Sequence, residues 1–161
     1  MMVATDDGAM LESVTVSEAR NCGRLFDQTV RSDRPVRIVR WKRDAAVLSS
    51  QALLTRLLER FTFHVSVIPE ETGGFTLWVR ELGVGAHGAT LQDARHALLG
   101  SVRSYVRHYF MRWEMYRHVS ETEAQLPYVM RLSLADDDKE LGRILFGAAP
   151  RTEAADKAEL G

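Results

Sequence analysis

The hydrophobic pattern of residues 11–60 predicts a strand, two helices, a hairpin and a third helix. Polar and apolar residues alternate over 12–16, as in a strand, and Ser17 can cap a helix that runs through Arg20. Gly23 is expected to break or bend that helix. A second helix is predicted from apolar residues at helical spacing, namely Leu25, Phe26 and Val30.

A hairpin and a leucine-rich helix complete this first block. Turn-forming residues at 32–35 end the second helix, and 36–40 and 45–49 are predicted as strands on either side of a turn at 41–44. Ser50 begins the next helix. Its apolar stripe consists of Leu53, Leu54, Leu57 and Leu58.

Residues 61–88 predict a small sheet. Alternation up to Pro69 indicates a strand with one buried face, followed by a Glu- and Gly-rich turn at 70–74. The partner strand is expected at 75–79, and a third short strand at 84–87. The buried face of the first strand is expected to carry Phe63, Val65 and Val67.

A long helix and a shorter one follow the sheet. Thr90 and Asp93 form a helix start of the capping-box type, and the helix is expected to run from Leu91 to about Arg117 with a weak point at Gly100. Its apolar stripe is Val102, Tyr105, Val106, Tyr109, Trp113 and Tyr116. Farther along, Pro127 is expected to interrupt an apolar segment, and Asp136-Asp137-Asp138 to start a last helix docked by Leu141, Ile144, Leu145 and Phe146.

These elements predict an α+β fold in two small modules. The length of 161 residues suits one ordinary domain or two small ones, and is short for a barrel enzyme of ~250 residues. We expect domains at 11–59 and 60–120, followed by a helical extension at 121–147. A flexible arm at 1–10 and a disordered tail at 148–161 are expected at the ends.

The formal net charge of −1 conceals an uneven distribution of charge. Residues 11–60 hold ten Lys/Arg against six Asp/Glu, whereas 121–161 hold five against nine. A solvated strand and turn would explain the basic cluster as well as a phosphate-binding surface would, so charge alone does not separate the two interpretations. The cluster consists of Arg31, Arg34, Arg37, Arg40, Lys42 and Arg43.

No motif of the sequence is typical of catalysis, a metal or a cofactor. Cys22 is the single cysteine, and the five histidines form neither HxxxH nor HExxH. The glycines at 83–88 match no phosphate loop. We therefore expect a protein that is not an enzyme and binds no cofactor. A cytoplasmic location is expected because no apolar run suits a signal peptide or a membrane span.

Three motifs occur together in the first block: Ser-Glu-Ala-Arg at 17–20, an arginine-ended strand at 35–40, and Ala-Ala-Val-Leu-Ser-Ser at 45–50. Together they resemble the Phd/YefM family of antitoxins over roughly residues 11–59. The resemblance implies a dimer whose N-terminal domains bind operator DNA and whose C-terminal part binds a toxin. The sequence departs from the family at Cys22-Gly23 and in its unusually basic turn, so the DNA contacts can differ.

The resemblance implies that Arg20 and Arg40 contact DNA. Phosphate contacts would supply affinity, and one or two arginines reaching guanine would supply sequence choice. Further DNA-binding candidates are Ser17, Arg37, Lys42 and Arg43. The block has too little core to stand alone, so a second subunit would complete it in a homodimer matched to a palindromic site, with pairing into tetramers left open. The residues it would cover are Leu25, Phe26, Val30, Ile38 and Val47.

The second block is similar to HicB-like antitoxins in its Glu-Glu-x-Gly-Gly-Phe turn at 70–75 and its helix start at 88–94. This similarity implies a degraded RNase H-like fold that binds and does not cleave, because His64 and Ser66 stand where a nuclease of that fold would carry metal-binding carboxylates. The stripe on the long helix most often packs on its own sheet. Its aromatic residues are nevertheless candidates for a partner contact, namely Tyr109, Trp113 and Tyr116.

The sequence thus predicts an antitoxin-like, dimeric DNA-binding repressor of a type II toxin–antitoxin system, with operator DNA and a toxin as partners. The alternative is a stand-alone regulator whose C-terminal domain binds a small ligand or mediates oligomerisation. A third hypothesis, a nucleic-acid-processing enzyme, is disfavoured because two of its four site residues lie in a predicted turn. That site would use Glu70, Glu71, His87 and Asp93.

Overall fold

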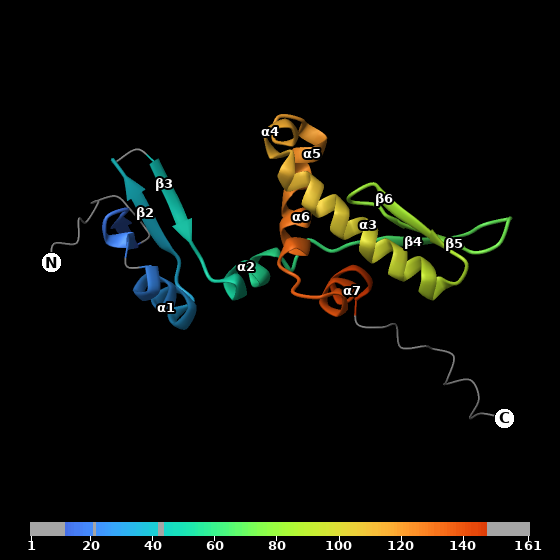
Figure 1. Cartoon of the computed structure of the whole chain (residues 1–161), viewed down its shortest axis with the longest axis horizontal. Helices are drawn as coiled ribbons and strands as arrows, with labels where there is room; N and C mark the ends of the chain where they lie inside the picture. The colour runs from blue at the N-terminus through green and yellow to red at the C-terminus, as the bar shows by residue number, and fades with distance from the viewer. Residues whose placement is uncertain (1–11, 21, 42–43, 148–161) are drawn as a thin grey trace, which may run out of the picture. The chain divides into compact units, whose positions relative to one another are not determined.

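The computed structural model describes residues 12–20, 22–41 and 44–147 (Figure 1). The arm expected at 1–10 and the tail expected at 148–161 lie outside the described residues. The chain divides into two compact units, 1–57 and 58–161. Each unit combines helices with a three-stranded sheet, so the α+β class expected from the sequence is confirmed for the described part of the chain.

The first unit contains a mixed sheet in the order β1-β2-β3. β1 (Glu12–Thr15) runs parallel to β2 (Val36–Arg40), and β3 (Asp44–Leu48) is antiparallel to β2. A parallel pair needs a crossover connection. The 3-10 helix η1 (Glu18–Arg20) and the α-helix α1 (Cys22–Ser32) supply it.

The start of α1 differs from the sequence prediction, whereas the start of the following helix agrees with it. Gly23 lies inside the first turn of α1 and does not break a helix, because α1 already begins at Cys22. Ser50 caps α2 (Gln51–Leu58) as expected, since its Oγ accepts the N–H of Leu53 at 3.0 Å.

The core of the first unit is small. Leu25 and Thr29 of α1 are buried, and the Thr29 hydroxyl donates to the Leu25 carbonyl at 2.8 Å, so this hydroxyl is satisfied inside the helix. Three apolar residues expected to need a second subunit are exposed in the single chain: Phe26 (61%), Val30 (52%) and Val47 (56%).

The second unit begins with an antiparallel meander. β4 (Val65–Pro69) pairs with β5 (Phe75–Val79), which pairs with β6 (Val84–Gly88). The sequence predicts a buried face on β4. That prediction is wrong for most of the strand, because β4 is an edge and only Val65 is half-buried while Val67 is 52% exposed.

Helix α3 (Leu91–Met111) lies across the sheet and packs on β6 and β5 (Figure 1). Thr90 and Asp93 form the expected capping box, with the Asp93 N–H donating to Thr90 Oγ1 at 3.1 Å and the Thr90 N–H to the Asp93 carboxylate at 3.2 Å. The helix ends at Met111, before the expected end near Arg117, and is unbroken at Gly100.

Short helices complete the second unit: α4 (Trp113–Tyr116), α5 (Ser120–Ala124), α6 (Leu126–Ser133) and α7 (Asp138–Phe146). Pro127 lies in the first turn of α6 and does not interrupt it, because a first-turn proline gives up no helical hydrogen bond. Asp137 caps α7 by accepting the Glu140 N–H at 2.7 Å. One cluster joins sheet and helices; among its buried members are Leu77, Leu98, Tyr109, Val129 and Leu145.

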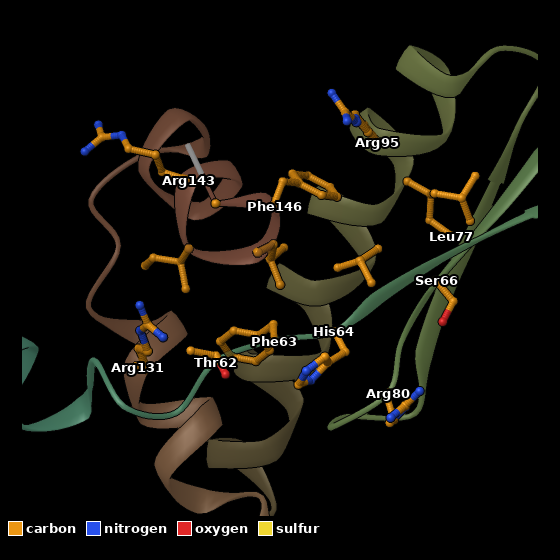
Figure 2. Close-up of a pocket in the computed structure, with 15 residues that line it drawn as sticks. Thr62, Phe63, His64, Ser66, Leu77, Arg80, Arg95, Arg131, Arg143 and Phe146 are labelled. Atoms are coloured by element: carbon orange, nitrogen blue, oxygen red, sulfur yellow. The ribbon is translucent and has the colours of Figure 1, made fainter. Parts of the chain in front are cut away.

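A pocket of about 730 Å³ lies beside β4 in the second unit (Figure 2). Its walls come from the segment that leads into β4, from β4 and β5, and from α3, α6 and α7. Apolar side chains such as Phe63 and Phe146 share these walls with arginines. The pocket therefore combines apolar and cationic surface.

Gly88 allows the end of β6 to approach the start of α3. A Cβ at this position would lie 2.1 Å from the Ala94 nitrogen and 2.5 Å from the Asp93 carbonyl carbon. Since backbone atoms cannot rotate away as a side chain would, Gly88→Ala is expected to destabilise the second unit by ~1–3 kcal/mol or more. Urea unfolding checks this, with Gly100→Ala as control because nothing lies within 4 Å of its added Cβ. Equal midpoints for the two variants would contradict the argument.

Candidate functional site

The Ser-Glu-Ala-Arg element directly follows β1, and its first turn is held by Thr15. Thr15 Oγ1 accepts the Glu18 N–H at 3.2 Å, and the Glu18 carboxylate accepts the Thr15 backbone N–H at 2.7 Å and its hydroxyl at 2.9 Å. These hydrogen bonds, the backbone one foremost, lower the pKa of Glu18. Thr15 thus supplies the side-chain cap that the sequence assigned to Ser17, while Ser17 and Arg20 are exposed.

Parallel pairing brings this element and the hairpin to one end of the sheet. The ladder runs from Glu12 opposite Val36 to Thr15 opposite Val39, and the Val16 N–H continues it by donating to the Val39 carbonyl at 3.2 Å. Because parallel strands run in the same direction, the segment after β1 starts at the sheet end where β2 finishes with Arg40. Residues about twenty positions apart in the chain therefore lie at the same end of the sheet.

Arg40 is oriented by its neighbours in the hairpin. Its guanidinium lies 2.9 Å from the Asp44 carboxylate, opposite it in the antiparallel pair, and 4.8 Å from the centre of the Trp41 ring. Trp41 is 82% exposed and has a φ of 50°, in the left-handed region. Since ion pairs as exposed as this one contribute only ~0.2–1 kcal/mol, Arg40 can exchange Asp44 for an anionic partner at little cost.

The structure places the other predicted residues of this site differently. Arg37 is the second residue of β2 and half-buried, and residues 37 and 40 point to opposite faces of the strand. Lys42 and Arg43 lie outside the described residues. The described end of the sheet therefore brings together Ser17, Arg20 and Arg40, with Arg37 set apart.

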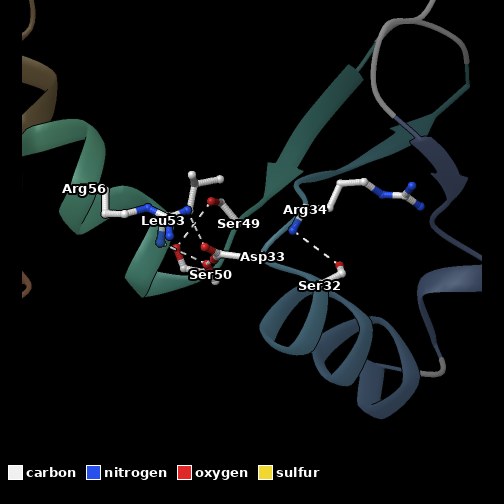
Figure 3. A network of polar contacts seen from close by, with 7 residues as sticks. All are labelled: Ser32, Asp33, Arg34, Ser49, Ser50, Leu53 and Arg56. Carbon is white, nitrogen blue, oxygen red and sulfur yellow. Dashed lines mark hydrogen bonds and ion pairs between the residues drawn. The ribbon is translucent and has the colours of Figure 1, made fainter.

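A polar network ties the first unit together on the side of α2 (Figure 3). Asp33, which has a φ of 53°, accepts hydrogen bonds from the Ser50 hydroxyl and the Arg56 guanidinium. Ser50 in turn caps α2. The loop after α1 is thus joined to the start of α2, and one basic residue of this unit is engaged away from the hairpin.

The aromatic residues proposed as partner contacts belong mainly to the core. Tyr109 is fully buried, its ring stacks on Tyr116 with centroids 5.2 Å apart, and its hydroxyl donates to the Thr122 carbonyl at 2.5 Å. Burial, followed by the negative charge of Glu123, raises the pKa of the Tyr109 hydroxyl. Tyr109 is therefore not accessible to a partner in this structure, whereas Trp113 and Tyr116 are half-buried and their partner role stays a prediction.

The residues of the enzyme hypothesis do not form a metal site. Glu70 and Glu71 lie in the β4–β5 turn, and Asp93 is engaged in the capping box. Among the described residues, no three His, Cys, Asp or Glu side chains gather where they could hold a metal ion. Within the same residues, every helix is too short or too polar to cross a bilayer.

The protein is thus a small α+β protein of two units, and the first unit carries exposed basic residues at one end of its sheet. The model of the PHD_like family, described as "Antitoxin of toxin-antitoxin, RelE / RelB, TA system", matches residues 10–146, so the chain belongs to this family of antitoxins. No curated protein sequence matches the chain significantly.

A solved structure from Syntrophomonas wolfei subsp. wolfei, described as an antitoxin part of a proposed toxin/antitoxin system, has a similar fold. The TM-score is 0.71 at 19% sequence identity, over 84% of this chain and 96% of that one. The match therefore extends through both units as a likeness of fold.

Two features of the structure were not predicted from the sequence. Trp41 and Asp44, which orient Arg40, were assigned only to a turn, although their position beside the arginine in a hairpin could have indicated cross-strand pairing. The arginines of the pocket in the second unit come from separate elements, and no sequence pattern connects them. They are Arg80, Arg95, Arg131 and Arg143.

Proposed function

We propose that this antitoxin is a dimeric DNA-binding repressor of its own toxin–antitoxin operon. The first unit binds operator DNA and the second binds the toxin. The family supports the toxin partner, and the arrangement of the first unit supports the DNA role. The single observation that carries the DNA role is the parallel β1–β2 register, which unites the Ser17–Arg20 element and Arg40 at one sheet end.

In DNA contacts from this end of the sheet, some residues would bind phosphates and others would contact base edges. Arg20 and Arg40 reach base edges or the phosphates beside them, and Ser17 donates its hydroxyl to a phosphate oxygen. Lys42 and Arg43, which follow Arg40 in the chain, add phosphate contacts in this proposal. The half-buried Arg37 contributes mainly to the positive potential of the sheet.

Dimerisation is supported by the apolar residues that the first unit leaves uncovered. Phe26 and Val30 lie one turn apart on α1, and Val47 is on β3. Exposed apolar side chains concentrated in so small a unit are typical of an interface. A two-fold dimer would present two copies of the basic sheet end to two half-sites of a palindrome.

The finer fold assignment is part of the same proposal. The order β1-η1-α1-β2-β3-α2 corresponds to the strand, helix pair, hairpin and helix of a Phd/YefM-like domain. The order β4-β5-β6-α3 corresponds to the hairpin, strand and helix of a HicB-like domain. We therefore propose a fusion of the two types, in which the second unit binds and does not cleave.

A mobility-shift assay with DNA from upstream of the protein's own gene tests the function. Specific binding by a dimer is expected, with random duplex as control. Affinity should fall steeply between about 50 and 200 mM salt, because each neutralised phosphate contributes ~0.9 to the slope of log affinity against log salt. Binding that is equal for both duplexes would remove the repressor role. DNA binding without any toxin co-purifying from the native locus would identify a stand-alone regulator.

A further inference from the structure

Four arginines contribute to the walls of the pocket beside β4 and lie around its rim in Figure 2. Arg80 follows β5, and the other arginines lie on α3, α6 and α7. A concave surface lined by one sign of charge raises the local concentration of counter-ions. The residues concerned are Arg80, Arg95, Arg131 and Arg143.

Two of these arginines are held by the protein and two are available. Arg131 donates to the Phe61 carbonyl at 2.6 Å, and Arg95 lies over the Phe146 ring at 5.1 Å. Arg80 and Arg143 are exposed, and the described residues give their side chains no acidic partner.

The acidic residue next to Arg80 in the chain is already engaged. The Glu81 carboxylate accepts the His64 backbone N–H and lies 2.6 Å from the His64 ring nitrogen Nδ1. Burial opposes ionisation of Glu81, but these hydrogen bonds outweigh it and lower its pKa. Glu81 is thus turned toward His64, and no ion pair joins it to Arg80.

The pocket also runs along an unpaired strand edge. Among the described strands, β4 pairs with β5 alone. The Arg80 N–H donates to the His64 carbonyl and the Glu70 N–H to the Gly74 carbonyl, both at 3.1 Å. Since bonded pairs alternate in an antiparallel ladder, Val65 and Val67 direct their N–H and C=O groups away from β5.

Consecutive residues of this edge line the pocket, from Val65 to Val67. Successive side chains of a strand point to opposite faces of the sheet, yet all three residues line the pocket. The pocket therefore runs along the edge of the sheet. Pro69, in the same outward-facing set, has no N–H and ends the row of donors. A short stretch of backbone donors and acceptors thus lies near two guanidinium groups that have no acidic partner among the described residues.

We propose that this pocket binds an extended acidic peptide segment of a partner protein as an added strand on β4. Backbone hydrogen bonds to Val65 and Val67 would align the segment, and Arg80 and Arg143 would pair with its carboxylates. Val67, half-exposed on the side of the sheet that faces the pocket, would contact its apolar side chains. This site is independent of the DNA role proposed for the first unit.

Nucleic acid fits the pocket less well than a peptide does. A concave pocket cannot follow the outside of a duplex, and single strands are bound largely by bases stacking on open aromatic faces. One face of Phe146 is covered by Arg95, and Phe63 packs edge-to-face with Tyr128 at 5.5 Å. The strand edge, in contrast, matches the hydrogen-bonding pattern of a peptide backbone.

Fluorescence anisotropy with the full chain tests the proposal. The probe is a fluorescein-labelled peptide, Thr-Glu-Val-Glu-Val-Glu-Thr, and its counterpart has lysine in place of glutamate. The acidic peptide is expected to bind at least about tenfold more tightly than the lysine peptide. The double variant Arg80→Gln, Arg143→Gln should weaken the acidic peptide by about tenfold or more, whereas Arg112→Gln, exposed and outside the pocket, should not.

Val67→Pro tests the strand addition separately from the charge. It removes an outward N–H and keeps every β4–β5 bond, so acidic-peptide binding should weaken by about fivefold or more. Val67→Ala keeps the N–H and loses only part of the apolar contact, so it should weaken binding by about twofold at most. Equal binding of both peptides, an unaffected arginine double variant, or an unaffected Val67→Pro variant would overturn the proposal. The proposal would also be overturned if a single-stranded oligonucleotide or ATP displaced the peptide and the binding of that competitor itself required Arg80 and Arg143. Operator binding should be unchanged in all these variants.

Discussion

Replacing Arg20 and Arg40 together by alanine is expected to weaken operator binding by about a hundredfold or more at about 150 mM salt. Each arginine that reaches a base edge contributes ~1–3 kcal/mol, and a tenfold change in affinity corresponds to ~1.4 kcal/mol. Arg20 follows β1 and Arg40 ends β2, and these parallel strands finish at the same end of the sheet, so the two arginines would act on one stretch of DNA. A mobility-shift titration of the single and double variants measures the effect.

The matched control for this experiment is Arg31→Ala. Arg31 is exposed in the last turn of α1, before the start of β2, and so belongs to the opposite end of the sheet from Arg40. Its loss should change affinity only about twofold, through the general field of the unit. If the Arg20, Arg40 double variant kept its circular dichroism spectrum and still bound operator DNA like the parent, the DNA role of this sheet end would be wrong.

Tyr109→Ala is expected to destabilise the second unit by ~3–5 kcal/mol, because it leaves a cavity in the centre of the core. Tyr109 is fully buried and touches Tyr105, Trp113 and Tyr116 through its ring. Tyr109→Phe keeps the ring and loses only the hydrogen bond to the Thr122 carbonyl, so it should cost ~1 kcal/mol. The ratio of these two effects separates packing from hydrogen bonding.

Urea unfolding followed by tryptophan fluorescence measures this difference. Trp113 lies 6.1 Å from the Tyr109 ring and reports on the second unit, and a Trp41→Phe background removes the signal of the first. The stability contributed by the raised pKa of Tyr109 is present at neutral pH and declines as the pH rises above 10, where the tyrosine of the unfolded chain ionises first. A Tyr109→Ala variant of unchanged stability that loses toxin binding would make Tyr109 a partner contact after all.

Local chemistry explains why most elements could be predicted. The capping pairs at Thr90 and Asp93, at Ser50 and at Asp137 lie within three residues of the groups they satisfy, so their effect is contained in short stretches of sequence. The hairpin strands likewise follow from alternation and turn residues. Predictions failed where a distant element decides, as at β4, which is an edge of the three-stranded sheet and leaves Val67 52% exposed although a buried face was predicted.

The DNA-binding candidates show the same division. The cluster of arginines and the Ser17–Arg20 element are visible in the sequence, but their common position depends on β1 pairing in parallel with β2 across the intervening helices. The opposite orientation of Arg37 depends on the register of that strand. The charges of the site could be predicted, and its geometry could not.

By itself the amino-acid sequence determined the α+β class, the order of most helices and strands, the basic first block and its resemblance to antitoxins. Only the tertiary structure decided that Tyr109 is core, that β4 is an exposed edge, and that arginines from three helices and the turn after β5 line one pocket. The physical reason is that strand order and helix packing bring together residues separated by tens of positions. Burial and shared charge arise from those long-range contacts, and no local pattern encodes them.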